Sequence, residues 1–118
     1  MSTPSKKPGL LRTTLAQRVV VADGAMGTML QAANPSLADF ENHEGCNEVL
    51  NVSRPDIVRS VHDEYLAAGV DAIETNTFGA NWSNLADYGI EDRIYELAFA
   101  GGKIAREAAD SFATPEKP

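Results

Sequence analysis

One segment sets the architecture of this chain: Arg18-Val19-Val20-Val21-Ala22-Asp23-Gly24. Consecutive β-branched residues that end in an Asp-Gly turn are typical of a short strand buried on both faces. A second apolar run that ends in polar residues follows at Val70-Asp71-Ala72-Ile73-Glu74-Thr75. We therefore predict strands at residues 18–22 and 70–75.

A helix is predicted between the two strands, at residues 53–68, where apolar residues recur at helical spacing. Ser53 is the predicted N-cap, and Pro55 suits the first turn. Asp56 stands where a capping box has its acidic residue. Gly69 provides the C-terminal stop.

The longest helix is predicted after the second strand, at residues 90–112. Gly101 lies on its apolar stripe, which predicts close packing of this helix against a strand. A short helix is predicted at residues 10–18. Residues 31–52 and 78–89 lack periodicity and are predicted to be loops.

The order of elements is β-α-β-α, which implies parallel strands and a right-handed crossover. We expect residues 1–14 to be a disordered lead-in, residues 15–113 to form the folded α/β unit, and residues 114–118 to be a tail. Two parallel strands cannot bury both of their faces alone. Open strand edges therefore predict self-association or aggregation.

The composition narrows the functional classes. The chain has 118 residues, 43% of them hydrophobic, which suits one globular domain. Its net charge of −7 opposes nucleic-acid binding. No apolar run approaches the roughly 20 residues of a membrane span. One cysteine excludes an internal disulfide, so we expect a cytoplasmic protein.

Polar turns follow both predicted strands, at residues 23–28 and 74–78. In parallel α/β folds, binding sites form at the carboxyl ends of the strands. A pocket for a small zwitterion is one interpretation, with Asp23 on the ammonium and turn N–H groups on the carboxylate. The alternative is that Asp23 and Asn76 only cap turns.

Other motifs are too incomplete to predict a site. Gly24-x-x-Gly27 lacks the remaining residues of a nucleotide-binding loop. His43-x-x-Cys46 has metal-ligand spacing but no second pair to complete it. His62 is expected to be a surface or boundary histidine. We predict no metal ligand and no catalytic residue in this chain.

Several blocks, in order and spacing, resemble one family. They are Val21-Ala22-Asp23-Gly24-Ala25-Met26-Gly27-Thr28-Met29-Leu30, Asn47-Glu48-Val49-Leu50-Asn51, Arg54-Pro55-Asp56-Ile57-Val58 and residues 68–81. The chain thereby resembles the opening of the homocysteine-binding domain of cobalamin-dependent methionine synthases, in the homocysteine S-methyltransferase family. Ala25 departs from the pattern, since the family usually has a second Gly there.

The resemblance implies the first β-α-β-α portion of a (β/α)₈ TIM barrel, incomplete in this chain. In the family, homocysteine binds as a zinc thiolate and attacks the methyl group of methylcobalamin. The zinc ligands are three cysteines from later strands, and Cys46 matches none of them. The substrate-binding residues implied by the match are Asp23, Gly24, Ala25, Glu74, Thr75, Asn76 and Thr77.

We accordingly expect a fragment of a methionine synthase that contributes part of the homocysteine pocket. Alone it should bind neither zinc nor cobalamin, bind homocysteine weakly or not at all, and be inactive. One alternative is a non-catalytic α/β piece that acts through self-association or partner binding. Another is a fragment of a cobalamin-independent homocysteine S-methyltransferase, although the 47–51 and 54–56 blocks favour the cobalamin type.

Overall fold

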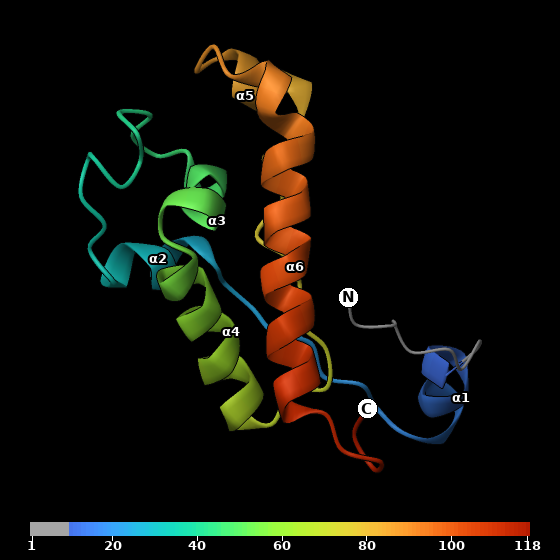
Figure 1. Ribbon diagram of the computed structural model, residues 1–118. Helices are drawn as coiled ribbons and strands as arrows, with labels where there is room; N and C mark the ends of the chain where they lie inside the picture. The colour runs from blue at the N-terminus through green and yellow to red at the C-terminus, as the bar shows by residue number, and fades with distance from the viewer. Residues whose placement is uncertain (1–9) are drawn as a thin grey trace.

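The computed structural model of the chain describes residues 10–118, and helices dominate them (Figure 1). The elements in chain order are α1 (Leu10–Gln17), α2 (Gly27–Ala32), the 3₁₀ turn η1 (Asn47–Val49), α3 (Leu50–Ser53), α4 (Pro55–Ala68), α5 (Trp82–Ala86), the 3₁₀ turn η2 (Glu91–Arg93) and α6 (Ile94–Phe112). The predicted lead-in lies outside the described residues up to residue 9, and residues 10–14 belong to α1.

The two segments predicted to be strands lie side by side in parallel, but they share a single bridge, Ala22 with Ala72. The Ala72 N–H donates to the Val21 carbonyl at 3.2 Å, and the Asp23 N–H donates to the Ala72 carbonyl at 3.0 Å. Within residues 10–118 no longer strand forms. The partial barrel implied by the resemblance therefore remains a prediction.

Burial of the valine run on both faces was wrongly predicted. Val19 is 80% exposed and Val21 is 52% exposed. The cause is packing: a parallel strand is buried only where layers cover both faces. The described residues do not supply a layer over these two side chains.

Helix α4 forms over nearly the predicted range, and Gly69 ends it in the left-handed region at φ 105°. The predicted N-cap is wrong, since Ser53 is the last residue of α3 and Arg54 holds the N-cap position. The Ser53 hydroxyl donates to the Val49 and Asp39 carbonyls instead. Back-bonding to the preceding turn is a common alternative for serine, and it removes the cap.

The two predicted loops contain short helices, so those predictions are wrong in part. Residues 47–53 form η1 and α3, where Val49 and Leu50 are fully buried. Helix α5 lies within the other predicted loop, and its Asn81 side chain accepts the Asn84 N–H at 2.9 Å. Helices this short do not show a repeating pattern of apolar residues in the sequence. Whether they form depends on the burial of one or two side chains.

The core lies where α4 and α6 pack together, with α2 and α3 beside them (Figure 1). One cluster joins α2, α3 and α4 through Leu30, Phe40, Leu50, Ile57, Val58 and Val61. A second joins η1, α5 and α6 through Cys46, Val49, Leu85, Ile90 and Leu97. Among residues 10–118, no helix has the length and apolar character needed to cross a bilayer.

The close packing predicted at Gly101 is confirmed, but its neighbours lie on α3 and in a turn and not on a strand. A Cβ on this residue would lie 2.7 Å from the Asn51 amide nitrogen and 2.8 Å from the Thr77 methyl carbon. Both distances are shorter than van der Waals contact allows. Helix α6 therefore approaches α3 and the turn after the second bridged segment more closely than any side chain would permit.

Candidate functional site

A cavity of about 320 Å³ lies where the two bridged segments end. Its lining consists of Asp23, Gly24, Met26, Gly27, Asn47, Glu48, Glu74, Thr75, Asn76 and Phe78. The turns at residues 23–27 and 74–78 therefore meet at one place, together with η1. Of the predicted binding residues, only Ala25 and Thr77 do not line the cavity.

Asp23 joins the two turns directly. Both of its carboxylate oxygens accept the backbone N–H of Glu74, at 3.1 Å each. The side chain therefore fixes the second turn and also lines the cavity. An ionised carboxylate at this position can accept a charge-assisted hydrogen bond from an ammonium group.

Asn76 is buried at 4% exposure, and its amide nitrogen bonds within the protein. It donates to the Asn47 carbonyl and to the Asn51 side-chain oxygen, each at 3.0 Å. The Asn51 amide in turn donates to the Asn76 carbonyl at 2.8 Å and to the Leu97 carbonyl at 3.1 Å. These bonds hold the turn at residues 74–78 against η1, α3 and α6. They use both N–H donors of the Asn51 side-chain amide.

The remaining predicted residues hold the turns in place. The Ala25 carbonyl accepts the Tyr65 hydroxyl at 2.7 Å, which ties the first turn to α4. Ala25 is not among the described residues with positive φ, so the departure from the family's usual glycine brings no backbone strain. Thr77 packs against Gly101, and its hydroxyl bonds that of Thr75.

Glu48 is a cavity residue that the sequence analysis missed. It is 7% exposed, and its Oε2 accepts the Gly79 N–H at 2.9 Å. Residues 31–52 were interpreted as a loop. A surface loop gives no reason to single out Glu48 among the 17 Asp and Glu residues of the chain. Its place beside Asn47, in a block quoted for the resemblance, was the only signal available.

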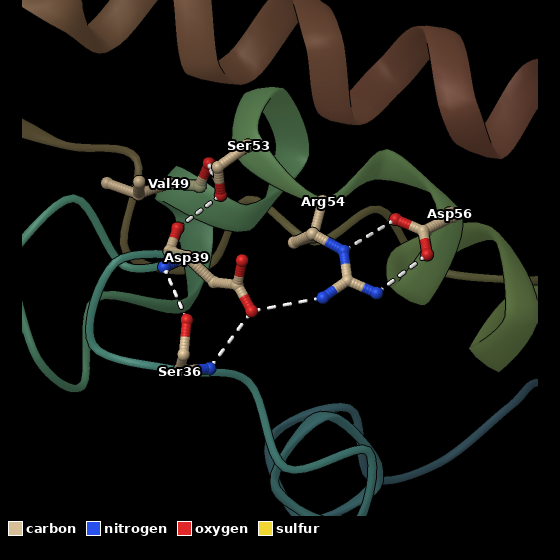
Figure 2. Close-up of polar contacts among 6 residues, drawn as sticks. All are labelled: Ser36, Asp39, Val49, Ser53, Arg54 and Asp56. Carbon is tan, nitrogen blue, oxygen red and sulfur yellow. Dashed lines mark hydrogen bonds and ion pairs between the residues drawn. The ribbon is translucent and has the colours of Figure 1, made fainter.

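Figure 2 shows how the segment with Ser36 and Asp39 is held by Ser53 of α3 and by Arg54 at the start of α4. The Arg54 guanidinium donates to Asp39 at 3.0 Å and to both oxygens of Asp56 at 2.8 and 2.9 Å. The Asp39 carboxylate also accepts the Ser36 N–H at 2.9 Å. The Ser36 N–H and Arg54 hold the pKa of the Asp39 carboxyl below its usual value.

The zinc chemistry implied by the resemblance does not fit the residues present. Cys46 is buried with its Sγ 3.8 Å from Glu48 Oε1, and burial followed by the Glu48 charge raises the pKa of this thiol. His43 packs edge-on against Tyr88. Within residues 10–118, no three His, Cys, Asp or Glu side chains are grouped to hold a metal ion.

Comparison with known proteins identifies the relatives of this chain. A family model described as homocysteine S-methyltransferase matches residues 20–117. A methionine synthase of Mycobacterium tuberculosis (strain ATCC 25618 / H37Rv) is 55% identical over 107 residues, which cover 91% of this chain and 9% of that protein. A methionine synthase of Mycobacterium leprae (strain TN) is 56% identical over 106 residues, with 90% and 9% covered.

The chain thus spans about 9% of the length of the curated relatives it matches. The matched range includes both turns of the cavity, η1 and the whole of α4 and α6. On this match the chain belongs to the homocysteine S-methyltransferase family.

Proposed function

We propose that this segment forms part of the homocysteine pocket of a methionine synthase, at the carboxyl ends of the first two strands of a (β/α)₈ barrel. The observation that carries the proposal is the cavity bounded by the turns at 23–27 and 74–78. The parallel bridge between Ala22 and Ala72 orients the turns toward the same end, as a barrel requires.

The chemistry of the cavity suits the amino-acid end of homocysteine. Asp23 would accept a hydrogen bond from the ligand ammonium while it holds the Glu74 N–H. Gly24 and Gly27 leave room for the backbone to approach a small ligand. Asn76 would act indirectly, because its side-chain amide donates to Asn51 and so fixes the shape of the turn that lines the cavity.

The methyl-transfer chemistry lies outside this segment in our proposal. Zinc would keep the homocysteine thiol ionised and cobalamin would supply the methyl group, but we assign no residue of 10–118 to either. The segment alone would therefore be inactive. We also propose a cytoplasmic setting, consistent with the unpaired thiol of Cys46.

The test is Asp23→Asn in a complete protein that carries this segment. The amide keeps the shape and removes the charge, so homocysteine affinity should fall about tenfold to a hundredfold, or roughly 1.5–3 kcal/mol. Zinc content should not change. Asp110→Asn is the matched control, because Asp110 pairs with Arg106 on the exposed side of α6.

Calorimetric titration with homocysteine, together with metal analysis, decides the outcome. If Asp23→Asn binds homocysteine as tightly as the unaltered protein, Asp23 is a turn cap and the proposal fails. Loss of zinc from the same variant would make the residue structural.

We further propose that the chain by itself self-associates. Val19 is 80% exposed just before the bridged residues Val21 and Ala22, and Tyr95 is 79% exposed on α6. The Tyr95 ring stacks on Phe99 at 5.9 Å between centroids, so together they form a continuous aromatic surface. Exposed apolar surface next to strand-like backbone favours pairing with another copy.

A further inference from the structure

Glu48 carries a buried charge without a basic partner. The side chain is 7% exposed, yet no ion pair within residues 10–118 includes it. Its hydrogen bonds come from the Gly79 N–H at 2.9 Å and the Cys46 thiol at 3.8 Å, both neutral groups. Buried carboxylates are normally paired with a cation or a metal, so this one calls for a positive partner.

The carboxyl group is also held rigidly in place. A Cβ on Gly79 would lie 2.8 Å from Glu48 Oε1 and 2.9 Å from Glu48 Cδ. A side chain at residue 79 would therefore overlap the carboxylate, whereas glycine lets its backbone N–H donate to Glu48 Oε2 at 2.9 Å. A group fixed this way is already oriented before a ligand arrives, which limits the entropy cost of binding.

The cavity beside Glu48 offers no cation of its own. Asp23, Glu48 and Glu74 all contribute to its lining, and none of the lining residues is Lys, Arg or His. Three carboxylates around about 320 Å³ repel one another unless a positive group enters. A ligand that carries an ammonium group would supply the positive charge that these lining residues lack.

We propose that Glu48 is a specificity-determining residue that selects, together with Asp23, a ligand carrying a free ammonium group. The selected class is α-amino acids with an unblocked amine, in preference to the same thiols without the amine. This inference rests on the proposed homocysteine pocket and assigns one of its residues. The hydrogen bond to Gly79 holds the carboxylate for that role.

The first experiment compares two ligands in a complete protein that carries this segment. Glu48→Gln keeps an acceptor for the Gly79 N–H and removes the charge. Its affinity for homocysteine should fall about tenfold, while its affinity for 4-mercaptobutanoate, which lacks the amine, should stay the same or rise. Equal losses for both ligands would show a structural role and overturn the proposal.

Comparison with Asp23→Asn separates this inference from the proposed function. If Asp23→Asn weakens homocysteine binding and Glu48→Gln does not, the pocket stands and the role of Glu48 fails. If neither substitution changes homocysteine affinity, both fail. Glu107→Gln, on the exposed face of α6, is the control for a general charge effect.

A second experiment uses the 118-residue chain without ligand. Because no cation among residues 10–118 pairs with the Glu48 carboxylate, Glu48→Gln should leave the urea unfolding midpoint unchanged or raise it. A clearly lowered midpoint would mean that the carboxylate serves to hold Gly79, and the proposed recognition role would be wrong.

Discussion

His62 should make the stability of this chain depend on pH between 8 and 5. Its ring is fully buried on α4, and neither ring nitrogen has a hydrogen-bond partner among the described residues. Burial lowers the pKa of His62, while the charges of Asp23 and Asp63 oppose that shift and Arg59 adds to it. The neutral ring is therefore the form that fits the fold, and the side chain is fully buried where the sequence predicted a surface or boundary histidine.

The direction follows from comparing the folded and unfolded states. An unfolded histidine titrates near pH 6.5, and the folded His62 titrates lower. Above about pH 6.5 both states are neutral, and the full stability is present. As the pH falls below that value, His62 binds a proton in the unfolded state but not in the folded state, so the free energy of unfolding decreases. The decrease ends when the pH reaches the pKa of His62 in the folded state.

The size of the effect follows from one proton. The free energy of unfolding should fall by up to about 1.4 kcal/mol per pH unit, and by at most about 2 kcal/mol between pH 8 and pH 5. That is a large part of the roughly 5–15 kcal/mol that a folded protein has. The paired carboxyls of Asp39 and Asp56 have lowered pKa values and affect stability only below about pH 4.

Urea unfolding followed by far-UV circular dichroism at several pH values provides the measurement. His62→Leu should remove the pH dependence, because leucine fills the site without a titrating group. The chain has one other histidine, so His43→Gln is the matched control and should keep the full dependence. A flat profile for the unaltered chain, or a slope that persists in His62→Leu, would refute the reasoning.

Two further predictions concern packing and association. Gly101→Ala should lower the free energy of unfolding by about 1–3 kcal/mol, because its Cβ would overlap Asn51 and Thr77, whereas Gly102→Ala, with open space around it, should raise it by about 0.5–1 kcal/mol. Thermal unfolding of both variants checks this, and equal effects would contradict the packing argument. Sedimentation velocity at micromolar concentration should show self-association that Val19→Lys reduces and Thr13→Lys does not. A monomer at that concentration would contradict the predicted self-association.

The two long helices could be predicted from sequence because local signals agree along them. Apolar residues at helical spacing define α4 and α6, and Gly69 ends the first at the expected residue. The short helices between residues 47 and 53 could not be predicted, since the burial of Val49 and Leu50 stabilises them. The predicted N-cap at Ser53 was wrong because this residue ends α3 and its hydroxyl donates to the Val49 and Asp39 carbonyls.

The sequence by itself determined the family, the two long helices and the two turns that carry polar groups. These are local patterns, and each can be recognised from a short stretch of the sequence alone. Only the tertiary structure decided which polar groups face the cavity. In the fold, the Asn76 amide donates a hydrogen bond to the Asn51 side chain. The Glu48 carboxylate accepts one from the N–H of Gly79, a residue distant in sequence. Hydrogen bonding of a buried polar group depends on partners that folding assembles from separate segments, and no local pattern specifies them.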